Sequence, residues 1–140
     1  MGLDLWGNEI PYNPFENFKV FEDHLTSLMR EQFDYVTPQK YIGDKPTGGK
    51  HIIDVCVDDV RVLISAKLQN TGGTAEEKIP YEQLMLQTAC DKYGYEKAYI
   101  VCAGEAWTLL DYYLSPEYRS LMNTPKVQVI KYNDFINEVI

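Results

Sequence analysis

The stretch "HIIDVCVDDVRVLISAKLQNTGGTAEEKIPYEQ", residues 51–83, holds two β-branched runs, a glycine-rich segment and the start of a helix. The runs 51–57 and 61–67 are separated by a few polar residues, which predicts a β-hairpin. Asp54 lies inside the first run, where an unpaired carboxylate is costly to bury. Lys67 ends the second run. The ends of two paired strands lie side by side, so the hairpin can bring these two charges together.

Helices and strands are predicted on both sides of this hairpin. Apolar residues recur at helical spacing over 15–33, so we expect an amphipathic helix with Asn13 as its cap and Pro14 in its first turn. Residues 35–42 predict a short strand broken near Pro38. The remaining expected elements are a helix at 81–94, a strand at 97–104, helical turns at 105–122 interrupted at Pro116, a strand at 126–132 and a terminal helix capped by Asn133.

This order of elements predicts an α/β fold. A hairpin followed by strand–helix–strand units gives a central mixed sheet flanked by helices. The length of 140 residues suits one domain spanning 1–140. The cysteines, at positions 56, 90 and 102, form no close pair, so reduced buried thiols are expected. No apolar run reaches the roughly 20 residues that cross a bilayer, and the N-terminus lacks a basic region, so we expect a cytoplasmic protein.

The charge is unevenly distributed along the chain. The net charge is −8, which argues against nucleic-acid binding by a basic surface. Residues 40–78, however, carry six basic and six acidic side chains, so the remaining seven basic and fifteen acidic residues account for the whole excess. The hairpin segment is therefore the neutral part of an acidic chain.

Asp54 and Lys67 suit metal-assisted chemistry. A carboxylate at a strand end can bind a divalent cation, and a neighbouring ammonium can orient a water molecule or stabilise a charged phosphate. The alternative is a structural ion pair between the two side chains, although such pairs do not stabilise a fold by default.

The same residues resemble the PD-(D/E)xK nuclease superfamily. "GGKHIIDV" is similar to its first half-motif, with Ile53 in the proline position, and "ISAK" is similar to the second. The segment that follows, "QNTGGTAEEKIPYEQ", resembles small phage, restriction-endonuclease-like and homing-endonuclease-like members. The resemblance covers about 15–103 and implies a restriction-endonuclease-like αβββαβ core with Asp54 and Lys67 as catalytic residues.

One motif position departs from the family. Ser65 stands where the acidic residue of (D/E)xK belongs, so another side chain must supply that oxygen ligand. Gln69 is the first candidate because it follows Lys67 by two residues on the same predicted strand face. Further candidates are Glu77 and Glu82. The alternatives are that Gln69 faces solvent and that Glu77 belongs to a charged first helical turn.

The resemblance also implies an acidic residue on the first helix. Glu22 matches that place, as a catalytic residue that contacts the metal directly or through water. Glu16 and Asp23 are its rivals, and a solvated helix surface is the alternative for Glu22.

Four residues are expected to contact DNA: Lys50, His51, Thr74 and Lys78. The backbone of Gly72–Thr74 can cradle a phosphate, although a plain turn explains it equally well. His51 can touch phosphate or lie on the surface without a role. The six tyrosines between 93 and 118 fit a core or an interface better than base stacking.

The sequence therefore predicts a Mg²⁺-dependent endonuclease that hydrolyses DNA, with Mn²⁺ as a second option. A small nuclease that cuts both strands needs two copies, so a homodimer or homotetramer is expected. The alternatives are a nuclease-like scaffold that binds DNA or a protein without cutting, and an acidic protein that binds a basic partner.

Overall fold

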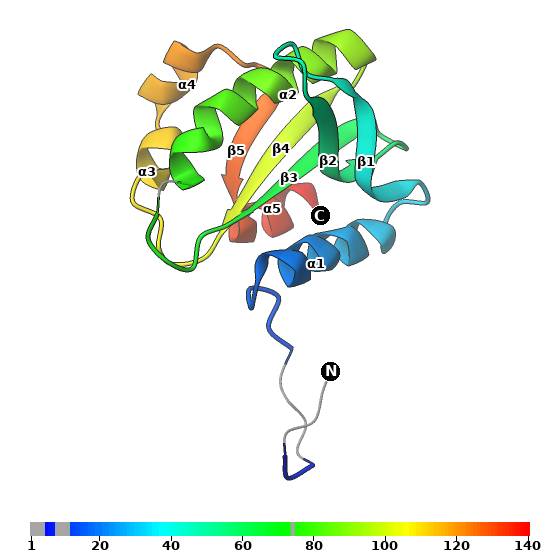
Figure 1. Cartoon of the computed structure of the whole chain (residues 1–140), viewed down its shortest axis with the longest axis vertical. Coiled ribbons are helices and arrows are strands. Elements are labelled where there is room, and N and C mark those ends of the chain that lie inside the picture. The colour runs from blue at the N-terminus through cyan, green and yellow to red at the C-terminus, as the bar shows by residue number, and fades with distance from the viewer. Residues whose placement is uncertain (1–4, 8–11, 74) are drawn as a thin grey trace.

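A computed structural model describes residues 5–7, 12–73 and 75–140, and its centre is a five-stranded sheet (Figure 1). The strands lie in sequence order: β1 (Val36–Asp44), β2 (Lys50–Val57), β3 (Val62–Leu68), β4 (Lys97–Ala103) and β5 (Val127–Lys131). Strand β2 is antiparallel to both of its neighbours, β1 and β3, whereas β3, β4 and β5 are parallel. The predicted mixed sheet is therefore confirmed.

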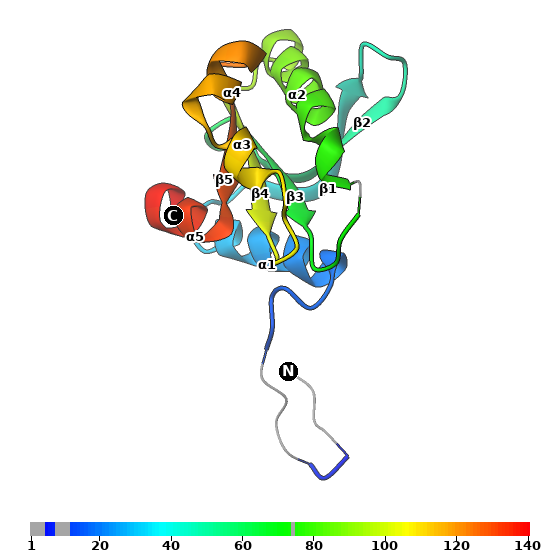
Figure 2. The same ribbon diagram turned by 90° about the vertical axis from the view of Figure 1, so that its left-hand side faces the viewer.

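Helices cover both faces of the sheet (Figure 2). One face carries α2 (Ile79–Tyr93), preceded by the short helix η1 (Ala75–Lys78), together with α3 (Leu110–Tyr113) and α4 (Pro116–Met122); the other carries α1 (Phe18–Arg30) and α5 (Tyr132–Val139). The order α1–β1–β2–β3–α2–β4 is the predicted αβββαβ core. In the described ranges, no helix is long and apolar enough to cross a bilayer.

Two apolar cores hold these layers together. Beneath the sheet, Phe21 and Leu25 of α1 are fully buried with Val55 of β2. Above it, Leu63 of β3 packs in a second cluster with Leu86 of α2. Full burial of such a side chain stabilises the fold by about 2 kcal/mol. The cores fix α1 and α2 on opposite faces of β3. The three cysteines are buried and free, as predicted.

Two predicted helix caps are wrong. Helix α1 begins at Phe18, and its cap is Asn17, whose side chain accepts a hydrogen bond from the Val20 amide at 3.0 Å. Asn13 instead accepts from Phe15 at 3.0 Å, in the turn before the helix. Helix α5 begins at Tyr132, so the predicted cap Asn133 lies inside it.

The predicted break at Pro38 is also wrong. Pro38 lies within β1 and is aligned with Val55 of β2. Because β1 is an edge strand, one side of it needs no ladder bond, and a proline is tolerated there. Near the end of β1, Gly43 has φ +134°, and a Cβ there would lie 2.2 Å from the Tyr93 ring of α2. The β1–β2 hairpin thus packs closely against α2.

Candidate functional site

The site lies where β2 and β3 separate. These strands pair only over Val55–Val57 and Val62–Ile64. Beyond that point β2 continues on β1, and β3 continues on β4. Asp54 is the first β2 residue past the paired segment, and its Oδ2 accepts a hydrogen bond from the Ala66 amide at 2.8 Å. The carboxylate therefore replaces a ladder bond and is held in the opening of the sheet.

Glu22 approaches Asp54 from helix α1. Its side chain faces inward, leaving the residue only 7% exposed. The Gln39 amide donates to both Glu22 oxygens at 2.9 and 3.1 Å, and to Asp54 Oδ1 at 3.5 Å. Gln39 has φ +49°, a conformation that is uncommon for a residue other than glycine and is often found at functional sites. From its place in β1, Gln39 thus donates hydrogen bonds to both carboxylates.

The two carboxyl groups perturb each other. Burial, followed by the charge of Asp54, raises the pKa of Glu22 to about 7. Burial also raises the pKa of Asp54, while the Ala66 amide and the charge of Lys67 oppose that rise. Two acids forced together in this way share too much negative charge, and a cation between them would relieve it.

Helix α2 supplies a third carboxylate. Glu82 lies in the first turn of α2, and its Oε2 is 2.8 Å from Lys67 Nζ. Its other oxygen, Oε1, accepts a hydrogen bond from the Ser65 hydroxyl. Burial lowers the pKa of Lys67, but Glu82 and Asp54 outweigh it, so the net pKa is raised. Lys67 is therefore a fixed positive charge. Ser65 and Lys67, the two ends of the S-A-K motif, both contact Glu82.

Asp54, Ser65, Lys67 and Glu82 line a cavity of about 280 Å³ between the β1–β2 hairpin, β3 and α2. Its lining residues are Lys45, His51, Ile52, Ile53, Asp54, Ser65, Lys67, Lys78, Tyr81, Glu82 and Met85. We call it the α2 cavity.

The structure does not bring Gln69 or Glu77 into this group. The Gln69 side chain is buried, and its amide donates to Glu76 at 2.7 Å. Strand β3 ends at Leu68, so the alternation that placed Gln69 beside Lys67 no longer applies. Glu77 is exposed on η1. Its charge lies near Tyr113 of α3, whose pKa is raised by burial, by Glu76 and then by Glu77. Both predicted ligands thus belong to the loop around η1 and α3.

The rivals of Glu22 lie elsewhere. Asp23 is exposed and pairs with Lys19 at 2.9 Å. Glu16 lines a different cavity, beside Phe15 and Asn70. Of these three acids, only Glu22 interacts with Asp54.

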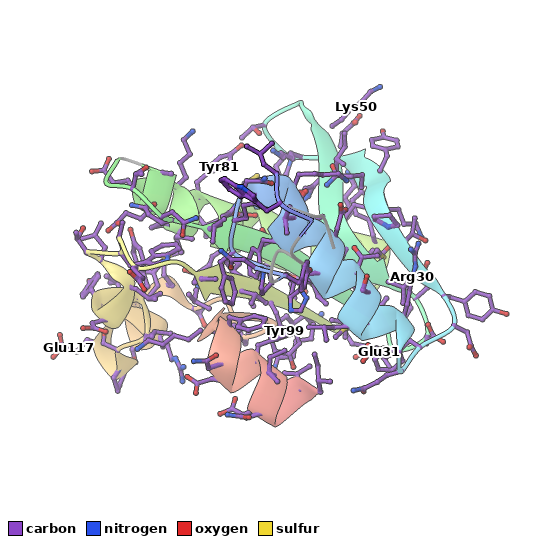
Figure 3. All side chains as sticks on the ribbon, turned by 90° about the horizontal axis from the view of Figure 1, so that it is seen from below. Arg30, Glu31, Lys50, Tyr81, Tyr99 and Glu117 are labelled. Atoms are coloured by element: carbon purple, nitrogen blue, oxygen red, sulfur yellow. The ribbon has the colours of Figure 1, made fainter. Side chains whose placement is uncertain are left out.

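The predicted DNA contacts take different positions. Lys78 and His51 line the α2 cavity, but His51 is buried, and burial followed by Lys45 lowers its pKa, so its ring is neutral at pH 7. Lys50 projects from the hairpin, and its Nζ lies 5.8 Å from the Tyr41 ring centroid (Figure 3). Thr74 lies outside the described residues.

Three residues of the site are not predicted by the sequence: Gln39, Lys45 and Tyr81. Gln39 lies in residues 35–42, for which the sequence predicts a broken strand, and its positive φ angle is not indicated by any sequence pattern. Lys45 and Tyr81 come together only because the hairpin tip packs on α2. Glu82 was one of three candidates, and the helical spacing of α2 alone did not single it out.

The donor set fits a hard cation. Glu22 and Asp54 offer only oxygen ligands, and Mg²⁺ commonly takes one or two carboxylates and completes its coordination with water and substrate phosphate. Within residues 5–7, 12–73 and 75–140, no group of three His, Cys, Asp or Glu side chains is arranged to hold a metal by itself. The pair of carboxylates therefore fits Mg²⁺ shared with a phosphate rather than a closed protein cage.

Comparison with known proteins agrees with this geometry. A family model described as the PD-(D/E)XK nuclease superfamily domain matches residues 16–139, from the residue before Asn17 to the end of α5. No curated protein and no solved structure matches the chain. The match spans nearly the whole sequence and includes every carboxylate of the site, so the chain belongs to the PD-(D/E)XK nuclease superfamily.

Proposed function

We propose that the protein is a Mg²⁺-dependent endonuclease that hydrolyses phosphodiester bonds in DNA. The observation that carries the proposal is the meeting of Glu22 from α1 and Asp54 from β2 on the amide of Gln39. Lys67 lines the same cavity as Asp54. Membership of the nuclease superfamily supports the same reaction class. Three buried thiols without disulfides favour the cytoplasm as the compartment.

Each side chain has a distinct role in this proposal. Asp54 and Glu22 hold the cation, and Gln39 keeps their carboxylates oriented. When bound, Mg²⁺ adds positive charge near the phosphate and lowers the pKa of a water. Lys67 orients the attacking water and stabilises the charge that develops on the phosphate. Mn²⁺ has similar ligand preferences and is expected to substitute.

Glu82 takes the place of the missing motif acid. The short Ser65 side chain leaves room on β3, and Glu82 reaches that space from α2 while bonding both Ser65 and Lys67. The carboxylate is thus contributed by the neighbouring helix instead of the strand. Its first role is to orient Lys67, because its Oε2 already contacts the ammonium at 2.8 Å.

A cleavage assay tests the proposed function. The purified protein is incubated with end-labelled single-stranded, duplex and branched DNA in Mg²⁺, Mn²⁺ or EDTA. We expect cutting that requires the metal and falls at least about 100-fold in Asp54→Ala and in Lys67→Ala. Asp23→Asn is the control, because Asp23 neighbours Glu22 but is exposed and paired with Lys19.

Two results would contradict the proposal. Metal-dependent cutting that survives Asp54→Ala and Lys67→Ala would place the active site elsewhere or reveal a contaminating nuclease. Failure of the folded wild type to cut any of these DNAs would favour a nuclease-like scaffold that only binds.

A further inference from the structure

The tip of the β1–β2 hairpin contacts helix α2 at Tyr81, which lines the α2 cavity. Thr47 at that tip and Tyr81 at the start of α2 are joined by a hydrogen bond of 2.9 Å between their hydroxyls. Lys45 Nζ lies 5.9 Å from the centroid of the same tyrosine ring. Lys45 and Tyr81 also line the cavity that contains Asp54 and Lys67. Tyr81 therefore forms a wall that the hairpin and α2 share, in the same cavity as Asp54 and Lys67.

The size of this cavity restricts what can enter. Its volume of about 280 Å³ lies just below the range of small-molecule pockets, which begins near roughly 300 Å³. One nucleotide of an extended strand is of this size, whereas a base pair with both backbones is much larger.

The lining supplies the two groups that bind an unpaired strand. Tyr81 remains 46% exposed, so its ring can stack on a base, an interaction available to every nucleotide. Lys45 and Lys78 line the same cavity, and in the part of the chain that the structure describes neither has a carboxylate within 4.0 Å. Free ammonium groups beside an aromatic ring suit a sugar–phosphate backbone with exposed bases.

The charge distribution favours one strand over two. Residues 40–78 are neutral overall, whereas the remaining chain carries the net −8. A duplex presents one phosphate charge per about 1.7 Å of axis, and its binding depends on broad neutralisation by Lys and Arg. The few lysines that line the cavity can serve a single backbone, but they do not provide the broad neutralisation that a duplex requires.

We propose that the α2 cavity binds an unpaired DNA strand, with a base stacked on Tyr81 and the flanking phosphates on Lys45 and Lys78. This inference rests on the proposed function, because it places the unpaired strand against Asp54 and Lys67. The substrate class is then single-stranded DNA or the unpaired arm of a branched molecule.

Fluorescence anisotropy with a labelled oligothymidine and the same strand in a duplex tests the proposal. The measurement uses the full chain with Asp54→Asn, in Mg²⁺, which blocks cutting and removes one negative charge. We expect the single strand to bind about tenfold more tightly than the duplex, and Tyr81→Leu to remove about tenfold of that affinity. Tyr81→Phe keeps the ring and should stay within about twofold of the parent.

Matched controls separate the site from the general surface. Tyr112→Leu changes a tyrosine on α3 with 48% exposure and should leave binding unchanged. Lys45→Ala and Lys78→Ala should each lower the slope of log affinity against log salt concentration by the value of about one phosphate contact. Lys92→Ala, near the far end of α2, should leave that slope unchanged.

The outcomes distinguish this proposal from the proposed function. Equal affinity for single strand and duplex, or equal losses in Tyr81→Leu and Tyr112→Leu, would overturn it. Equal losses in Tyr81→Phe and Tyr81→Leu would overturn the stacking role, because only the Thr47 bond is common to both changes. Selective binding that depends on Tyr81, in a wild type that cuts nothing, would support this inference while refuting the nuclease reaction.

Discussion

Glu22 and Asp54 form an unfavourable pair in the absence of a cation. Glu22 is buried and Asp54 is half-buried, and burial followed by the charge of Asp54 raises the pKa of Glu22 to about 7. Gln39 is a neutral donor whose side-chain amide contacts both groups. A fold optimised only for stability would not keep two carboxylates in one opening, so their proximity indicates a function for the pair.

This pair makes the stability of the metal-free protein depend on pH. The Glu22 carboxyl loses its proton near 4.5 in the unfolded chain but only at about 7 in the folded chain. Between these values the folded state binds more protons, so the free energy of unfolding decreases as pH rises through that window. Urea unfolding in EDTA at a series of pH values should show this decrease, and Glu22→Gln should flatten it. Asp23→Asn is the control, and an equal flattening there would contradict the assignment.

Glu82 can be tested by moving its carboxylate back to the strand. Glu82→Gln keeps the shape of the side chain but removes the charge that contacts Lys67, so cutting should fall about 100-fold. Adding Ser65→Glu to that variant places a carboxylate at the motif position and should recover part of the loss in the same cleavage assay. Full activity in Glu82→Gln would show that the carboxylate of α2 has no part in the reaction.

Among the elements, α1 shows what sequence reasoning could and could not find. Its apolar spacing predicted the helix correctly, but its start was placed at the wrong asparagine. Both Asn13 and Asn17 cap a backbone amide, and only the path of the chain decides which of them begins the helix. The distinction matters because the start of α1 positions Glu22.

The two asparagines give a direct comparison. Asn17→Ala should lower the free energy of unfolding by about 1 kcal/mol, the usual cost of losing a helix N-cap. Asn13→Ala should cost less, because its bond to Phe15 belongs to a turn outside the helix. Chemical denaturation of both variants measures the difference, and a larger loss for Asn13→Ala would contradict the observed cap.

The end of strand β3 is the reason that the prediction for Gln69 is wrong. Ser65 and Lys67 lie two residues apart in β3, and both contact Glu82. Extending strand alternation to Gln69 failed because β3 ends at Leu68 and the chain turns toward η1. Motif spacing thus predicted Asp54 and Lys67, which lie within regular strands, whereas the position of the Glu82 carboxylate depends on the packing of α2 on the sheet.

In the whole molecule, one site per chain can cut one strand at a time. A break in both strands of a duplex needs two sites, so the homodimer or homotetramer expected from the sequence stays a prediction. Sedimentation velocity gives the mass of the free protein. If duplex DNA is cut on both strands, we expect two or four times the chain mass of 16.2 kDa. A monomer that cuts both strands in one binding event would contradict that expectation. A monomer that cuts only unpaired strands would fit the binding mode inferred for Tyr81.

The central claim is that Asp54 and Glu22, at the opening between β2 and β3, hold a divalent cation. Paramagnetic titration with Mn²⁺ tests it without DNA and without turnover. At about pH 8, above the raised pKa of Glu22, we predict one ion bound per chain in the wild type and in Asp23→Asn. Binding should be at least tenfold weaker in Asp54→Asn and in Glu22→Gln. Undiminished Mn²⁺ binding by folded Asp54→Asn would contradict the account.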